Sequence, residues 1–434
     1  MFREASTRHR RHLPPTAIVA PSRRLEYAYY AAVLYSVMAP AIGLEVPLLA
    51  GVMILGISAL CFFQLQSCGK LSVYRPISLL LAFAVCFLSV QIFIHDESIL
   101  DSTIRGYIIW ILSLMIVHSL SLRSGFSLRF PLVLFAIAAA TIPFIGIGGG
   151  EMDKARVDIA VQGGLTHPGG LGEWFGFLTI YFAVVGLQAR RPVFRIGAWS
   201  IAVGCLFIVT LTIERGPLFA TLLAVAVVFR RVLKRGFAPV VVLLVMSGVI
   251  YEAGLFGAAF SKYSERGLEE TGREVLWPAA IDRIVDSPFF GVGESKVNIP
   301  LGTKDVPPHN VFLHLALSAG IVPVALFFAF WCQAFMKSIR RPGEGISDHM
   351  RLPFLVYTFL DIMLGDWAYM SIWALLTVSV GAGSAMTYHP QFRRALRSIR
   401  TRQEVRLDRW AVRRGNLQRF RARSIPSTPG KSSN

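Results

Sequence analysis

Long apolar runs separated by short polar turns dominate this chain. A helix needs about 20 mostly apolar residues to cross a bilayer whose hydrocarbon core is about 30 Å thick. Counted in this way, the pattern predicts twelve spans, near residues 26–43, 46–66, 77–94, 104–121, 130–148, 170–188, 196–213, 217–233, 238–260, 310–333, 352–365 and 367–386. The last two are short and only Gly365-Asp366 lies between them, so a re-entrant hairpin is the alternative for this pair. The predicted fold class is an all-α polytopic membrane protein with about 12 transmembrane helices.

The basic residues predict the topology of these spans, because cytoplasmic loops of membrane proteins carry an excess of lysine and arginine. On one side of the predicted membrane the loops carry Arg23, Arg24, Lys70, Arg75, Arg123, Arg129, Arg190, Arg191, Arg195, Arg230, Arg231, Lys234, Arg235, Lys337, Arg340 and Arg341. Loops on the other side are acidic or mixed, such as His95-Asp96-Glu97 and the segment 151–167. Both termini are therefore expected in the cytoplasm of a bacterium, with the protein spanning the inner membrane many times.

This topology divides the chain into five regions. They are a basic cytoplasmic N-terminus (1–25), transmembrane helices 1–9 (26–260), a large periplasmic loop (261–309), transmembrane helices 10–12 (310–386) and a basic cytoplasmic tail (387–434). Apolar residues recur at roughly helical spacing in the tail, which predicts a basic amphipathic helix on the inner leaflet. A solvated tail that fixes topology is the alternative interpretation.

The composition agrees with a membrane protein. Of 434 residues, 54% are hydrophobic and 16% are charged, whereas soluble domains carry about 25% charged residues. The net charge of +18 would suggest a nucleic-acid partner in a soluble protein, but here the basic residues lie in loops and in the tail, where they contact anionic lipid. No nucleic-acid binding is expected. Five cysteines lie in or near apolar runs without zinc-type spacing, so neither a disulfide framework nor a metal site is predicted.

The loop 261–309 is the longest polar stretch between two apolar runs, which makes it the natural place for aqueous chemistry. Thr271 and Glu274 have the spacing of a helix capping box. The apolar face that follows is interrupted by Pro278, so the pattern predicts a kinked helix on the membrane surface, with Trp277 at the level of the headgroups. This loop is the predicted catalytic region.

Arg273 would lie in the first turn of that helix, where the helix dipole disfavours a cation. A cation in this place indicates an anionic partner, although a salt bridge to Glu270 would also explain it. The segment Ser287–Gly293 contains a G-x-G pattern, which favours a plain turn over a phosphate-binding loop.

A histidine and an asparagine follow at the end of the loop. Pro307-Pro308 predicts an extended approach to the next span, and Asn310 is a good cap for its first turn. The positive end of the helix dipole favours a neutral His309, which is the form that acts as a general base. A purely structural role for this histidine is the alternative.

Another arginine occupies a very short turn, 211–217, between two predicted spans. Arg215 would lie at or just below the headgroups, where a charge is costly and therefore paired or functional. An ion pair with Glu214 or snorkelling are the structural alternatives. Glu173 enters a span on the same side, and Glu252 and Asp361 are ionisable residues within spans that are candidates to pair with the arginines.

Taken together, three segments resemble the O-antigen ligase/polymerase family of bacterial envelope glycosyltransferases. These are Glu214–Pro217, which resembles the family's Arg-Gly turn, the stretch from Gly272 to Gly293, which resembles its outer-loop signature, and Pro308–Gly320, which resembles its His-Asn motif. The resemblance covers about residues 165–335. It departs from the family at His167-Pro168-Gly169-Gly170, where members often have His-x-Asn, so a role for that segment is open.

The resemblance implies a fold similar to GT-C-type glycosyltransferases and a donor glycan linked by pyrophosphate to a polyprenol. It implies transfer at the periplasmic face with inversion and without metal or cofactor, most simply polymerisation of repeat units of an exopolysaccharide or surface polysaccharide. The alternatives are ligation of O-antigen to a lipid core or, in another class, transport of a lipid-linked oligosaccharide. Other polysaccharide assembly and export proteins are expected partners. The expected catalytic residues are His309, Arg215 and Arg273, and substrate contacts are expected from Arg215, Arg273, Asn310, Trp277 and Glu173.

Overall fold

The computed structural model describes most of the predicted spans and the second half of the large loop. The described residues are 22–41, 49–67, 75–99, 101–121, 126–141, 145–147, 157–161, 164–166, 168–233, 273–301, 304–340 and 346–364. The predicted spans 238–260 and 367–386, the first part of the large loop with Thr271, and both basic terminal regions lie outside these ranges.

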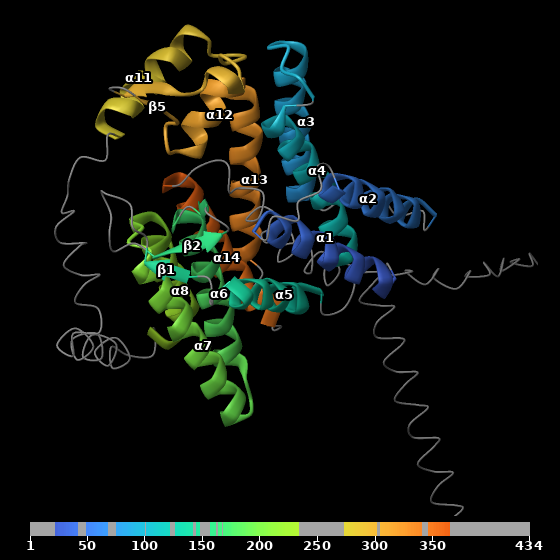
Figure 1. Cartoon of the computed structure of the whole chain (residues 1–434), viewed down its shortest axis with the longest axis vertical. Coiled ribbons are helices and arrows are strands. Elements are labelled where there is room, and N and C mark those ends of the chain that lie inside the picture. Colours follow the sequence, from blue (N-terminus) through green and yellow to red (C-terminus); the bar gives the residue numbers. More distant parts are fainter. Residues whose placement is uncertain are drawn as a thin grey trace, which may run out of the picture. The chain divides into compact units, whose positions relative to one another are not determined.

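The described chain is mostly helical, as the apolar runs predicted (Figure 1). The helices are α1 (Arg23–Ala41), α2 (Leu49–Ser67), α3 (Arg75–Phe93), α4 (Ser102–Ser121), α5 (Phe126–Thr141), α6 (Pro168–Gln188), α7 (Pro192–Leu211), α8 (Arg215–Leu233), α11 (Arg273–Asp286), α12 (Val311–Ala319), α13 (Ile321–Arg340) and α14 (Ile346–Leu364). Within the described residues, three stretches are long and apolar enough to cross a membrane: Gly170–Gln188, Pro192–Leu211 and Ile321–Ile339. The number of twelve spans stays a prediction.

Two predicted boundaries are wrong. The span predicted at 130–148 is a helix that ends at Thr141, because Pro143 disfavours helical geometry in the residue before it. The span predicted at 352–365 begins earlier, and α14 runs through its Pro353.

Short strands were also not expected in an all-α fold. β1 (Ile145–Ile147), β2 (Val157–Val161) and β3 (Gly164–Thr166) form an antiparallel sheet, and β4 (Ile299–Leu301) and β5 (Lys304–Val306) form a hairpin. In the hairpin, Ile299 lies opposite Val306. These strands are three to five residues long, which is too short for an alternating pattern to stand out in the sequence.

The most important correction concerns the span predicted at 310–333, which is broken at Gly320 into α12 and α13. Gly320 has a φ of 82°, and a Cβ at this position would collide with the backbone of Phe289. The turn 287–293 satisfies the end of α12, because Val292 N donates to Leu317 O at 2.7 Å and Gly293 N donates to Ser318 O at 3.1 Å. The G-x-G segment is therefore a structural turn, as the favoured interpretation held, and these two amides are not available to a phosphate.

The described residues contain two hydrophobic cores. The larger core lies between the long helices, where α6 packs against α7, α8 and α14, and α3 packs along α13 (Figure 1). The smaller core joins α11, α12 and the β4–β5 hairpin through Leu276, Ala280, Val297, Ile299 and Leu317. We call residues 273–319, with the short 3₁₀ helix η2 (Glu294–Lys296), the loop unit. The predicted catalytic loop thus has a core of its own.

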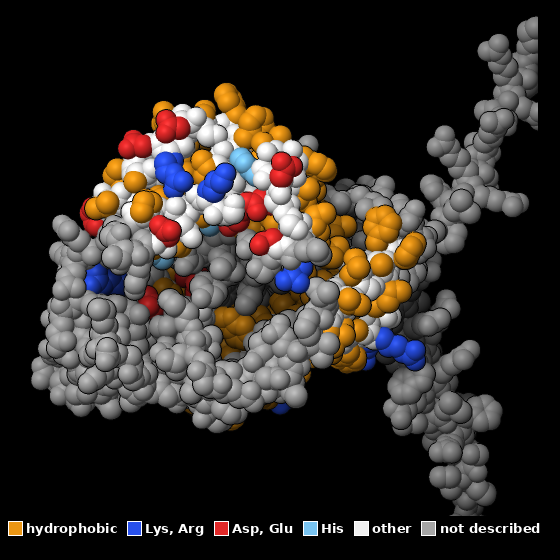
Figure 2. Space-filling view, turned by 45° about the horizontal axis from the view of Figure 1, so that its top comes forward, with side chains coloured by type: hydrophobic (Ala, Val, Ile, Leu, Met, Phe, Trp, Pro, Cys, Tyr) orange, Lys and Arg blue, Asp and Glu red, His pale blue; other side chains and the backbone are white. Residues whose placement is uncertain are grey.

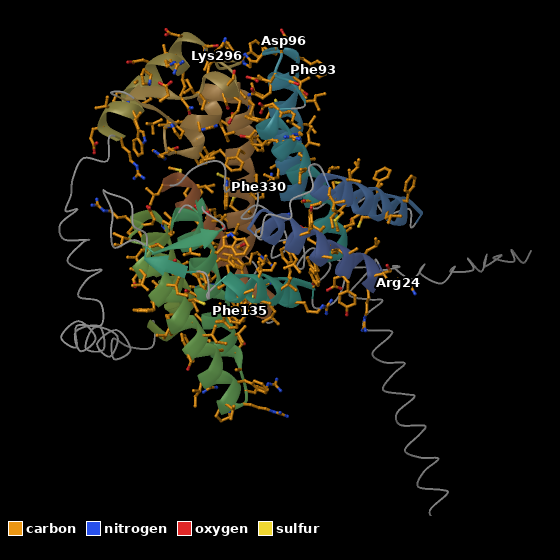
Figure 3. All side chains as sticks on the ribbon, viewed as in Figure 1. Arg24, Phe93, Asp96, Phe135, Lys296 and Phe330 are labelled. Atoms are coloured by element: carbon orange, nitrogen blue, oxygen red, sulfur yellow. The ribbon has the colours of Figure 1, made fainter. Side chains whose placement is uncertain are left out.

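The loop unit contacts turns that the charge pattern placed on the same side of the membrane. Ser295 N donates to the carboxylate of Glu97, in the turn between α3 and α4, at 3.1 Å. Figure 3 accordingly shows Asp96 of that turn and Lys296 of η2 at the same end of the described chain. Both turns belong to the predicted periplasmic side.

A different contact joins two segments that were predicted on the cytoplasmic side. The guanidinium of Arg129 in α5 donates to both carboxylate oxygens of Glu26 in α1, at 2.7 and 2.9 Å. Glu26 is buried, and Arg24 beside it lies well away from Asp96 and Lys296 in Figure 3. These contacts are consistent with the predicted topology, which stays a prediction.

Replacing Gly320 by alanine is expected to destabilise the protein, since the new Cβ meets the backbone of Phe289 at a positive φ. A loss of about 1–3 kcal/mol in unfolding free energy is expected from strain of this kind. The measurement is thermal unfolding of the detergent-solubilised protein. Gly197→Ala in α7 is the control, because no atom lies within 4 Å of its added Cβ, and it is expected to be neutral or slightly stabilising. Equal melting temperatures for the two variants would contradict this account of the break.

Candidate active site

Arg273 connects the loop unit to the end of a long helix. It is the first residue of α11, and its Nη2 donates a hydrogen bond of 2.8 Å to the carbonyl oxygen of Leu364. Leu364 is the last residue of α14, where backbone carbonyls lack helical partners and the helix dipole is negative. The cation that is unfavourable at the start of its own helix is therefore stabilised by the end of another.

Arg215 begins α8 close to the same helix end. A Cβ on its neighbour Gly216 would lie 3.4 Å from the Cβ of Leu364. The start of α8 and the end of α14 are thus in contact, and Arg273 is bound to that same end. Two of the three predicted catalytic residues, which are 58 positions apart in the sequence, are brought to one place.

The two arginines affect each other electrostatically. Burial lowers the pKa of Arg273, and the charge of Arg215 lowers it further, whereas Glu274 and Glu214 raise it. Arginine nevertheless stays protonated in proteins. Two half-buried cations held close together favour an anionic ligand between them, and guanidinium groups match the geometry of phosphate.

The turn before Arg215 has an unusual backbone. Ile213 has a φ of 55° and its side chain is buried, although a β-branched residue rarely adopts this left-handed conformation. Such conformations persist only where the surrounding structure enforces them, and they cluster at functional sites. Among the described residues, the other non-glycine positions with positive φ are Asp96 and His309. The sequence pattern gave no sign of this strain at Ile213.

His309 is connected to α11 through the residue before it. The indole Nε1 of Trp277 donates to Pro308 O at 3.0 Å, and Trp277 lies one helical turn, or about 6 Å along the axis, after Arg273. His309 itself has a φ of 48°. Asn310 caps α12 as predicted, because its Oδ1 accepts hydrogen bonds from Phe312 N and Leu313 N at 3.0 and 3.2 Å.

Glu173 lies deeper than the sequence suggested. It is a buried residue near the start of α6, and its carbonyl accepts a 2.7 Å hydrogen bond from the hydroxyl of Tyr357 in α14. Gly176, one turn later, allows α6 to approach closely, since a Cβ there would collide with Thr221 and Tyr357. Close packing of α6, α8 and α14 therefore supports the helix ends that carry the arginines.

A polar network that sequence reasoning missed fixes the other side of the loop unit. Oε1 of Glu294 accepts hydrogen bonds from Tyr107 of α4 at 3.3 Å and lies 2.9 Å from Nε2 of His314 in α12. Glu294 N donates to Oε1 of Gln91 at 2.9 Å, and Gln91 Nε2 donates to Ser318 O at 3.0 Å. The sequence carries one sign of this network, which is the presence of two polar residues, Gln91 and His314, inside predicted spans.

The surface of the loop unit is charged. Its exposed ionisable residues are Glu274, Asp282, Asp286, Lys296 and Asp305. Figure 2 shows acidic, basic and histidine side chains gathered at the end of the molecule that this unit forms, while apolar side chains cover much of the neighbouring described surface. The arrangement is that of a polar site at the end of an apolar helical bundle.

Comparison with known protein families identifies a match in the region that contains the candidate site residues. Residues 200–328 match the family model described as O-antigen ligase. This part of the chain is similar to an O-antigen ligase domain. No curated protein matches the chain. The matched residues of the O-antigen ligase domain include Arg215, Arg273 and His309, and they lie within the part of the chain where the resemblance was found. The match supports a polysaccharide ligase or polymerase, an enzyme acting on lipid-linked glycans in the bacterial inner membrane.

Within the described residues, His, Cys, Asp and Glu side chains do not gather in groups of three or more that could hold a metal ion. This observation does not test whether the reaction needs a metal, so a metal-independent reaction stays a prediction. The positive charge present at the site comes from arginine side chains.

Replacing Glu294 by alanine is expected to lower the free energy of unfolding by about 1–3 kcal/mol, because half-buried Tyr107 and buried His314 lose their shared acceptor. Glu294→Gln keeps an acceptor oxygen and is expected to lose less. Thermal unfolding in detergent measures both. Asp282→Ala, which removes an exposed carboxylate from α11, is the control and is expected to change stability by about 0.5 kcal/mol or less. If Glu294→Ala were as stable as this control, the network would not hold the loop unit.

Proposed function

We propose that this protein transfers a glycan from a polyprenyl pyrophosphate donor to a sugar hydroxyl of an acceptor at the periplasmic face of the inner membrane. The observation that carries the proposal is the meeting of Arg215 and Arg273 at the end of α14, with the His309 turn attached to the same helix as Arg273. In this reading the loop unit covers the site from the periplasm.

The arginines act on the leaving group. As the bond between the anomeric carbon and the phosphate oxygen breaks, its electron pair passes to the pyrophosphate, whose negative charge increases. Two guanidinium groups that the protein already holds near one another stabilise this charge with little rearrangement. Because the arginines supply the positive charge, the reaction proceeds without a metal ion.

His309 acts on the acceptor. Its neutral imidazole takes the proton from the acceptor hydroxyl while the oxygen forms the new bond to the anomeric carbon. The acceptor attacks from the side opposite the pyrophosphate, so the anomeric configuration is inverted. The left-handed backbone at His309 is consistent with a side chain that is held in a functional orientation.

The remaining expected residues have supporting roles. Asn310 positions His309 by capping the helix that follows, and the indole N–H of Trp277 fixes the Pro308 carbonyl beside it. The ring of Trp277 is then the part that contacts the sugar. Glu173 is buried near the start of α6, and its carbonyl is held by Tyr357 of α14, so its proposed role is to support the packing of α6 against α14 rather than to contact the substrate directly.

Polymerisation of repeat units of an exopolysaccharide or surface polysaccharide is the reaction proposed here. Ligation of finished O-antigen to a lipid core is the second candidate, favoured because the matching family is described as O-antigen ligase. Other assembly and export proteins would supply the donor and remove the product. A transporter of lipid-linked oligosaccharides is the alternative from another class.

One assay distinguishes these functions. The purified protein is reconstituted in vesicles with a lipid-linked repeat unit, first alone and then with lipid core. Longer lipid-linked glycan together with released polyprenyl pyrophosphate supports the polymerase. Product on the lipid core alone supports the ligase, and movement of the donor across the bilayer without a new bond contradicts an enzyme.

His309→Ala is expected to lower turnover by about 10²–10⁴-fold, the usual contribution of general acid–base catalysis. Expression and melting temperature are expected to stay near those of the parent protein, because the Asn310 cap is intact. The measurement is the rate of polyprenyl pyrophosphate release. His349→Ala in α14 is the matched control and is expected to keep full activity. Unchanged turnover in His309→Ala would remove this residue from the mechanism.

Arg215→Ala and Arg273→Ala are each expected to lower turnover by about 10²–10³-fold, as for loss of one preorganised charge-stabilising group. Because both arginines would hold one diphosphate, the double variant is expected to lose much less than the product of the single losses. Arg195→Ala, at the start of α7, is the control. Losses that multiply without any coupling would show that the arginines act at separate places.

A further inference from the structure

A group of exposed apolar residues surrounds the place where the loop unit meets the ends of two long helices. These residues are between 48% and 77% exposed. We call them the apolar rim: Phe93 and Ile94 at the end of α3, Phe289 and Phe290 in the turn of the loop unit, and Ile321 and Val322 at the start of α13.

Hydrogen bonds hold the three parts of the apolar rim together. Nε2 of His95 lies 2.8 Å from the carbonyl oxygen of Phe290, which joins the turn to the end of α3. Ile321 N donates to Pro288 O at 2.9 Å, which joins the same turn to the start of α13. The backbone on both sides of Phe289 is therefore fixed, and the two phenylalanines are presented outward by a rigid turn.

The depth of the rim follows from the helices that flank it. Ile321–Ile339 is one of the stretches long and apolar enough to cross the bilayer, so Ile321 marks one end of a span. At the end of α3, exposed Asp96 follows Phe93 by three residues and marks the change to a polar environment. In Figure 3, Phe93 and Asp96 lie at the same end of α3. The rim thus lies at the level where the helices leave the hydrocarbon.

The apolar surface also continues toward the middle of the membrane. Phe328 of α13 is exposed and lies two helical turns after Ile321, on the same face of the helix. An exposed apolar patch that continues a lipid-facing helix surface is covered most simply by the same lipid. A second copy of the chain or a soluble partner would not require the apolar rim to continue into the exposed apolar surface of α13.

We propose that Phe289 and Phe290 insert into the periplasmic leaflet of the bilayer and anchor the loop unit to the lipid surface. The inserted turn would keep the loop unit, and with it Arg273 and His309, at the depth where a lipid-linked pyrophosphate lies. The anchor itself does not depend on the proposed reaction, because its occupant is the acyl region of the membrane lipid.

The test measures the environment of residue 289 directly. The five native cysteines are replaced, Phe289→Cys is introduced and labelled with an environment-sensitive fluorophore, and the full chain is placed in nanodiscs of phosphatidylethanolamine and phosphatidylglycerol. Lys296→Cys, on exposed η2 of the same loop unit, is the matched control. Lipid carrying a nitroxide near the headgroup end of its acyl chain is expected to quench the label at 289 severalfold more than at 296, and aqueous iodide is expected to do the reverse.

Three results would overturn the anchor. They are equal iodide quenching at both positions, lipid-like quenching at 289 that appears only after polyprenyl pyrophosphate is added, and quenching that depends on the number of protein copies per nanodisc. The second result would assign the rim to the donor's tail, and the third to another copy of the chain.

A measurement without substitutions covers the case in which the variants do not fold. The parent protein is reconstituted with a phospholipid that carries a photoreactive diazirine in its acyl chain, irradiated and digested. Label on the peptide containing Phe289-Phe290 supports insertion. Label on peptides from α3 and α13, with none on that peptide, contradicts it. Neither readout needs glycan transfer, so the anchor and the proposed reaction can fail independently.

Discussion

The hydrogen bond from the Arg273 guanidinium to the backbone carbonyl of Leu364 is the contact on which the site depends. It joins the cation at the start of α11 to the negative end of α14. The bond therefore stabilises a cation that its own helix dipole disfavours and provides a donor for a carbonyl at the end of α14. Because Arg215 begins the neighbouring helix at the same point, the contact also creates a pair of like charges. This pair of cations is the feature on which the proposed binding of a diphosphate rests.

The sequence predicted the parts of this arrangement but not their meeting. Hydropathy located most of the described long helices, since twenty apolar residues have few other stable states. Local chemistry predicted the cap at Asn310, because a cap depends on neighbours within three residues. The arginines stood out as charges where charge is costly. The hydrogen bond from Arg273 to Leu364 could not be predicted, because its acceptor is a main-chain atom and carries no residue signature.

The break at Gly320 shows why hydropathy was not sufficient. Residues 310–333 are apolar throughout, so their composition fits one continuous helix. The interruption is imposed by a turn from elsewhere in the chain, which supplies the partners for the end of α12 and occupies the space beside the glycine. The network around Glu294 was missed for the same reason, since its members come from four separate segments. Tertiary contacts of this kind leave little trace in a periodic pattern.

The predicted topology places the two hydrophobic cores in different solvents. Helices in lipid gain little from excluding water and are held by close packing. The small core of Leu276, Ala280 and Val297 lies in the loop predicted to be periplasmic, where a core is expected to depend on the hydrophobic effect. Urea and cooling weaken the second kind of core more than the first. The loop unit, which carries Arg273 and His309, is therefore expected to unfold under conditions that leave the long helices intact. A preparation that keeps most of its helical content can then lack the arrangement of these residues.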